Sequence, residues 1–210
     1  MNRCSLFLAS LLAAAAPVAA SPAAAAQATP TSACAIHVYP ADGVHSVGED
    51  FDAVHRVDQD LRDYYKAAGR SLDWLVPSRQ LALIGDVPVA SLLGLAEGSR
   101  VLHSEPVTRL QALNTPAPAA ADGCVVQVLL PQIMLERGGL AVRSLRLFGI
   151  VRRYQNGALA SGYTGFAAVP LTGFKIKSPA DADSSTAIVE QSYRGAVETL
   201  LRNSVKPNRK

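Results

Sequence analysis

The first 28 residues constrain this chain more than any other feature. Arg3 is the one charged residue among them, and it precedes an apolar run from Leu6 to Ala20 and a small-x-small pattern at 26–28. One positive charge, a short apolar stretch and a cleavage site of small residues are typical of a secretory signal peptide. The run is short and rich in alanine compared with a membrane span of ~20 strongly apolar residues. We therefore expect a cleaved leader and a mature protein that works outside the cytosol.

The rest of the chain is expected to form one domain. Residues 29–33 are small and uncharged, which is typical of a flexible leader. We find no internal repeat and no second boundary, so we predict a single domain over 34–205 and a basic tail over 206–210. The roughly 182 residues that remain after cleavage are enough for one hydrophobic core.

The charge balance excludes few partners but argues against nucleic acid. The sequence holds 20 Lys and Arg against 17 Asp and Glu, and loss of Arg3 leaves a nearly neutral mature chain. Such a mild excess does not favour a nucleic acid or a strongly acidic substrate, and export argues against nucleic acid as well. We expect a periplasmic or secreted protein without a transmembrane span.

Two cysteines remain once Cys4 is removed with the leader. Cys34 and Cys124 are expected to pair in an oxidising compartment, and the alternative is two separate buried thiols. Acylation of Cys34, as in lipid-anchored exported proteins, is less favoured because Thr31 occupies the position where such signals usually carry leucine.

The first half of the domain predicts a strand followed by helices. Alternation over Cys34–Tyr39 places Cys34, Ile36 and Val38 on one face of a strand. Ser46 and Glu49 have the spacing of a capping box, which predicts a long helix from there to Gly69. Further along, the pattern predicts short helices at 78–84 and 86–93, an edge strand at 101–107 and a loop at 111–123.

The second half has a clearer pattern. It predicts strands at 125–135, 143–154 and 158–169, with a hairpin turn at Asn156-Gly157. Ser178 and Pro179 then begin a final helix that runs to Leu201. This order predicts an α+β fold, a two-layer sandwich of two main helices on a mostly antiparallel sheet with a three-strand meander.

Few residues suggest catalysis or a bound metal, and none suggests a cofactor. The segment Val44-His45-Ser46-Val47-Gly48 approaches the Gly-x-Ser-x-Gly elbow of serine hydrolases but lacks its first glycine. A small periplasmic hydrolase that uses Ser46 with a histidine such as His103 is our alternative hypothesis. Asp52, His55 and His45 offer a less favoured three-ligand metal site, and no metal-binding or nucleotide-binding motif is present.

One surface pattern favours binding. In the strand 143–154, alternation places Arg146, Phe148, Arg152 and Tyr154 on one face. Arginines interleaved with aromatic rings suit an anionic lipid head, a glycan or a protein partner. The alternative is ordinary cross-strand pairing under a helix, with solvated arginines.

The order of elements resembles that of small accessory domains of the bacterial envelope. The strand Cys34–Tyr39, the meander through Asn156-Gly157 and the terminal helix from Pro179 to Leu201 are similar to the TolB amino-terminal domain and to auxiliary subunits of lipid-transport systems. The resemblance implies a non-catalytic adaptor in envelope assembly or transport. We therefore expect an exported, non-catalytic binding or adaptor protein.

Overall fold

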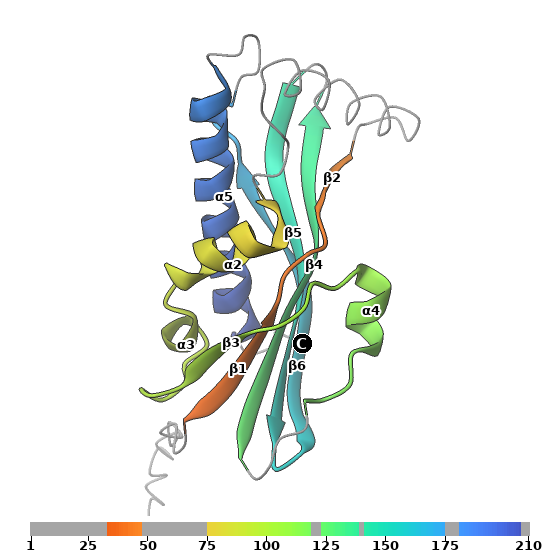
Figure 1. Cartoon of the computed structure of the whole chain (residues 1–210), viewed down its shortest axis with the longest axis vertical. Coiled ribbons are helices and arrows are strands. Elements are labelled where there is room, and N and C mark those ends of the chain that lie inside the picture. Colours follow the sequence, from red (N-terminus) through yellow and green to blue (C-terminus); the bar gives the residue numbers. More distant parts are fainter. Residues whose placement is uncertain (1–32, 48–74, 119–122, 139–140, 175–180, 207–210) are drawn as a thin grey trace, which may run out of the picture.

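The computed structural model describes residues 33–47, 75–118, 123–138, 141–174 and 181–206. Its strands are β1 (Cys34–Tyr39), β2 (Val44–Val47), β3 (Arg100–His103), β4 (Cys124–Gly138), β5 (Ala141–Gln155) and β6 (Ala158–Pro170). Its helices are α2 (Pro77–Gly85), α3 (Val89–Leu92), α4 (Arg109–Asn114) and α5 (Asp181–Ser204) (Figure 1). The predicted signal peptide, most of the leader and the end of the basic tail lie outside the described residues.

All six strands belong to one mixed sheet in the order β3-β1-β4-β5-β6, with β2 also paired to β4. The 15-residue strand β4 is central because β1 pairs with its first part and β2 with its second part, both in parallel. β4, β5 and β6 form the predicted antiparallel meander. The α+β fold is thus confirmed, and the parallel strands β1, β2 and β3 extend the meander on one side.

The two faces of the sheet are covered unequally. α5 packs on β5 and β6, and α2 and α3 pack against α5 on the same side of the sheet (Figure 1). The main core lies between these helices and the sheet. The short helix α4 lies on the opposite side, where a second, smaller cluster is buried.

The periodicity of the last helix is confirmed. The six residues predicted to form its core face are buried, namely Val189, Tyr193, Ala196, Val197, Leu200 and Leu201. Their spacing places one apolar stripe of α5 along the sheet. Burial raises the pKa of the Tyr193 hydroxyl, which lies 3.4 Å from Oε1 of Gln80.

Gln80 joins α2 to the break between β1 and β2. Its side-chain oxygen accepts a hydrogen bond from the Ala41 backbone nitrogen at 2.9 Å, and its amide nitrogen donates to the carbonyl oxygens of Ala41 and Leu75. Gln80 is fully buried. The buried Gln80 amide thus gives hydrogen-bond partners to backbone groups of Ala41 and Leu75 that would otherwise have none.

The hairpin between β5 and β6 follows the predicted turn chemistry. Asn156 and Gly157 both have positive φ, 50° and 78°. Two successive residues with positive φ match the right-handed twist of the flanking strands. The turn therefore sets the pairing at the end of a long hairpin, whose register shifts once between Arg153 and Tyr154.

Two predicted helix starts were wrong where the structure describes them, although α2 and α3 lie where the short helices were predicted. Ser46 and Val47 pair with Leu135 and Glu136 as part of β2, so Ser46 does not cap a helix that begins at Val47. The remainder of that predicted helix lies outside the described residues. α2 begins with Pro77 after Val76, without a side-chain cap from Ser78.

The prediction of a loop at 111–123 was also wrong for its first residues. Residues 109–114 form α4, which Thr108 and Gln111 close with a reciprocal capping box. The edge strand predicted at 101–107 is shorter, since β3 ends at His103. None of the helices in the described ranges is long and apolar enough to cross a membrane.

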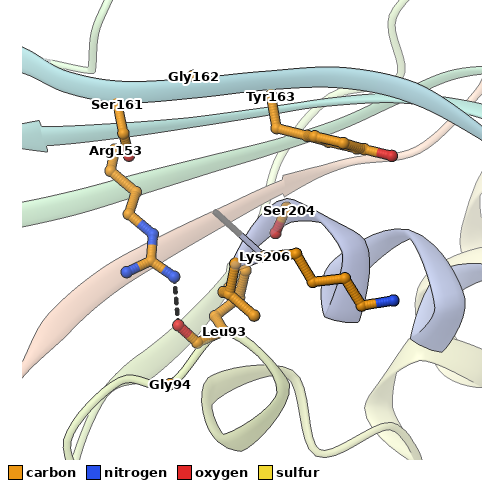
Figure 2. Close-up of a pocket in the computed structure, with 9 residues that line it drawn as sticks. Leu93, Gly94, Arg153, Ser161, Gly162, Tyr163, Ser204 and Lys206 are labelled. Carbon is orange, nitrogen blue, oxygen red and sulfur yellow. Dashed lines mark hydrogen bonds between the residues drawn. The ribbon is translucent and has the colours of Figure 1, made fainter. Parts of the chain in front are cut away.

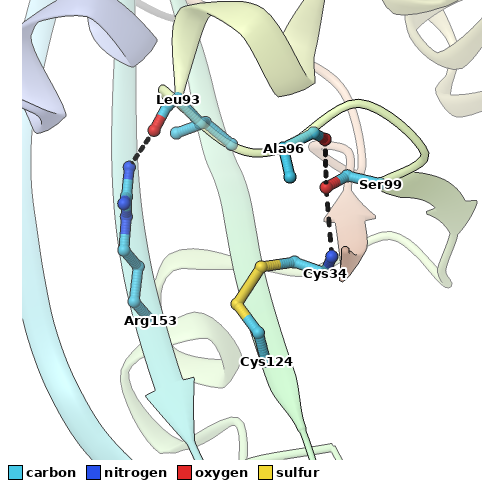
Figure 3. Close-up of a disulfide and its surroundings, with 6 residues drawn as sticks. All are labelled: Cys34, Leu93, Ala96, Ser99, Cys124 and Arg153. Atoms are coloured by element: carbon cyan, nitrogen blue, oxygen red, sulfur yellow. Dashed lines mark hydrogen bonds between the residues drawn. A yellow bond between two sulfur atoms is a disulfide. The ribbon is translucent and has the colours of Figure 1, made fainter. Parts of the chain in front are cut away.

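The predicted disulfide is present. Cys34 and Cys124 are register partners in β1 and β4 with Cα atoms 4.6 Å apart, and the bond joins residues separated by 90 positions (Figure 3). The Cys34 backbone nitrogen also donates to Oγ of Ser99 at 3.0 Å, and that hydroxyl donates to the Ala96 carbonyl. With its sulfur in this bond, Cys34 has no free thiol to acylate.

Removing the disulfide is expected to destabilise the fold strongly. For a separation of 90 residues, loss of the cross-link in Cys34→Ser lowers the free energy of unfolding by roughly 4 kcal/mol on the chain-entropy model. Urea denaturation of the oxidised variant and the oxidised wild type measures this difference. Reduced wild type is the control and should match the variant; equal midpoints for all three samples would contradict the prediction.

Gly149 is required by the close approach of α5 to β5. A Cβ at this position would overlap the side chain of the fully buried Leu200. Gly149→Ala should therefore cost about 1–3 kcal/mol through overpacking. Gly85→Ala at the end of α2 is the control because its Cβ would meet nothing within 4 Å. Equal thermal midpoints for the two variants would show that α5 can shift away from β5.

Candidate functional site

The predicted basic and aromatic stripe lies on the face of the sheet that α4 covers. Phe148 and Ile150 are buried there with Leu129, Val107 and Ala112. Arg109 of α4 stacks over the Phe148 ring, with its guanidinium carbon 4.8 Å from the ring centroid. Phe148 is therefore the centre of a small core and is only 4% exposed.

Arg152 holds the end of α4. Its guanidinium donates to the carbonyl oxygens of Thr115 at 3.0 Å, Leu113 at 3.1 Å and Ala112 at 3.2 Å. These carbonyls belong to the last turn of the helix, where they have no partner within the helix. A cation at this end also interacts favourably with the helix dipole. Arg152 thus fixes α4 to β5.

Tyr154 extends this attachment beyond the helix. Its hydroxyl donates to Oε1 of Gln127 at 3.1 Å, and Nε2 of Gln127 donates to the Pro116 carbonyl at 2.7 Å. Gln127 is fully buried in β4. The Tyr154–Gln127 pair therefore holds the segment that follows α4.

Arg146 is the member of the stripe that remains most accessible. Its side chain is 46% exposed and lies 3.2 Å from a Glu136 oxygen. Phe166 of β6, 49% exposed, packs on Phe148 with ring centroids 4.9 Å apart. The four predicted residues share one face as expected. Phe148 and Arg152 contact α4 directly, and Tyr154 is linked to the residues after it through Gln127.

Arg153, the residue after Arg152, binds the end of a helix on the other face of the sheet. Arg153 donates to the carbonyl oxygen of Leu93, the residue that ends α3 (Figure 3). Burial lowers the pKa of its guanidinium, which is half-buried. Sequence reasoning gave Arg153 no role. The signal that could have revealed it is the adjacent pair Arg152-Arg153, since consecutive strand residues point to opposite faces.

Arg153 also lines a pocket of about 430 Å³ at the C-terminal end of α5. Lys206, Ser161, Tyr163 and Ser204 share its wall (Figure 2). Lys206 donates to Asn203 at 2.8 Å and is otherwise exposed. Two cations and three hydroxyl groups are donors of the kind that bind phosphate or carboxylate groups.

The residues of the hydrolase hypothesis lie far apart. His103 pairs with Val38, which pairs with Val128 of β4, whereas Ser46 pairs with Leu135. Seven residues along a strand span about 23 Å, so this serine and this histidine do not form a catalytic pair. No group of three or more metal-ligating side chains occurs among the described residues, and His55 and Asp52 lie outside them.

Comparison with known proteins gives only distant structural likeness. No family model and no curated protein matches the chain by sequence. A Xanthomonas campestris protein of the DUF330 family has 10% identity and a TM-score of 0.44, with 84% of each chain covered. The lipoprotein GNA1162 from Neisseria meningitidis has 12% identity and a TM-score of 0.21, covering 76% of this chain and 97% of its own. Similarity at this level does not define a shared function.

Replacing Arg152 tests its attachment to α4. Arg152→Met should lower the free energy of unfolding by roughly 2 kcal/mol because three carbonyls lose a charged donor. Arg146→Met is the matched control on the same face, and loss of an exposed ion pair should cost about 1 kcal/mol or less. Urea denaturation followed by circular dichroism measures both. If Arg152→Met were no more destabilising than Arg146→Met, the attachment of α4 would not depend on this side chain.

Proposed function

We propose that this protein is an exported, non-catalytic binding or adaptor protein of the bacterial cell envelope. The observation that carries the proposal is the Cys34–Cys124 disulfide. A structural disulfide forms and persists in an oxidising compartment such as the periplasm. The leader-like pattern of the first 28 residues supports the same compartment.

The accessible cations support contact with an anionic partner. Arg146, with the exposed ring of Phe166 on the next strand, lies on one face of the sheet. The pocket of Arg153 and Lys206 lies on the other. Arginine and aromatic side chains are enriched at protein interfaces, and an acidic envelope protein, a glycan or an anionic lipid matches this chemistry. The resemblance to envelope accessory domains leads to the same class of role.

Charge reversal tests the contact surface. Arg146→Glu should sharply reduce the amount of envelope protein or lipid that is cross-linked to the full chain in living bacteria. Arg202→Glu is the matched control because Arg202 is also exposed and also pairs with a glutamate, Glu198 at 3.6 Å. Mass spectrometry of the captured material, normalised to the amount of chain, measures the loss.

The cross-linking experiment distinguishes three outcomes. Loss with Arg146→Glu and retention with Arg202→Glu supports binding at the Arg146 face. Loss with Lys206→Glu in place of Arg146→Glu would move the binding surface to the pocket. Equal capture by all variants would remove both basic surfaces from the proposal.

A further inference from the structure

Apart from one irregularity near its start, at Ala160, β6 lacks the features that usually protect the outer edge of a sheet. β6 is the last strand of the sheet, and within the described residues no strand pairs with its outer side. Its 13 residues, ALASGYTGFAAVP, contain no charged side chain, and the single proline is the final residue. Most of them are exposed. Exposed edges normally carry charges, prolines or bulges, because free backbone groups bind other strands.

The opposite edge of the same sheet provides the contrast. β3 has only four residues, and Arg100 and His103 lie at its two ends. A short strand with charged or polar ends is protected against further pairing. Beyond the irregularity opposite Arg153 and Tyr154, β6 instead continues in regular register up to Pro170. The β6 edge of the sheet is therefore more open to pairing with another strand than the β3 edge.

We propose that β6 pairs in antiparallel fashion with β6 of a second copy of this chain, around a two-fold axis at Thr164. A second copy fits because the strand is uncharged, so pairing it with itself opposes no like charges. Antiparallel self-pairing also closes a two-fold dimer, which is the commonest form of soluble oligomer. The two sheets then become one continuous sheet.

The register around Thr164 places aromatic rings opposite glycines. Phe166 faces Gly162 of the second copy. Tyr163 faces Gly165 of the second copy, but each Gly165 is already covered by the Tyr163 ring of its own chain, so Phe166 makes the new contact. Phe166 is 49% exposed in the single chain, and the space above Gly162 is open for 4 Å around a Cβ position. Aromatic side chains that cover cross-strand glycines stabilise designed and natural sheets. The pairing thus covers a half-exposed ring with no change in the strand.

The position of Phe166 adds a second contact. Phe166 pairs with Phe148 within its own sheet, and Gly162 pairs with Arg152. In the proposed register, a single row across the axis therefore runs from Phe148 through Phe166 to Gly162 and Arg152 of the second copy. An arginine beside an aromatic face is favourable, so this row extends the small core under α4.

Cysteine cross-linking tests the axis directly. Only the residue on a two-fold axis meets its own equivalent, so Thr164→Cys should form a dimer on mild oxidation of the purified, natively disulfide-bonded chain. Ser161→Cys is the matched control on the same strand, because its two copies would lie about 20 Å apart along the strand direction. Non-reducing electrophoresis measures the dimer fraction, which should be large for Thr164→Cys and close to background for Ser161→Cys.

A charge variant gives an independent readout. Thr164→Lys places two like charges at the axis and should convert the dimer to a monomer in light scattering, while circular dichroism shows that the chain is still folded. Equal cross-linking at both cysteine positions, or a wild-type chain that is monomeric at high concentration, would overturn the proposal. A monomeric wild type leaves the envelope-binding proposal untouched, because that proposal rests on the Cys34–Cys124 disulfide and on the cations Arg146 and Lys206, which lie outside β6.

Discussion

The pairing of β1 with β4 determines the arrangement of the rest of the sheet. The disulfide joins Cys34 and Cys124 directly across these two strands, although 90 positions separate them. Pairing between strands so distant in sequence carries a large loop-closure cost, and the cross-link reduces that cost. Once β1 is fixed, β3 adds to its outer side and β2 continues along β4. Gln80 of α2 holds the chain turn between β1 and β2 through its hydrogen bond with Ala41.

β5 then attaches one short helix to each face of the sheet. Arg152 binds the carbonyls that end α4, and Arg153 binds the carbonyl that ends α3. Both arginines fulfil the same physical requirement, since the last carbonyls of a helix need donors from outside it. Two adjacent residues can do so on opposite faces only in a strand. The basic character of β5 therefore has a structural explanation at Arg152 and Arg153, while the Arg146 side chain remains exposed.

Local patterns predicted the elements whose burial is one-sided. The stripe of α5, the alternation in β1, the Asn156-Gly157 turn and the disulfide were all readable because each depends on nearby residues or on pairing chemistry. The parallel pairing of β1 with β4 was not predicted, because side-chain alternation is the same in parallel and antiparallel strands. α4 was missed because it has only six residues and precedes a Pro/Ala-rich stretch, although Thr108 and Gln111 carry a capping-box spacing. Alternation placed the stripe residues on one face, but only the fold shows that α4 covers Phe148.

Export into an oxidising compartment is the claim on which this account most depends. The direct measurement is intact-mass analysis of the full-length chain expressed in a bacterial host, after cell fractionation and thiol alkylation without reductant. The account predicts a product in the periplasm or medium that lacks the first 28 residues and takes up alkylating reagent at Cys34 and Cys124 only after reduction. A full-length cytosolic product, with both of these thiols alkylated at once, would contradict it.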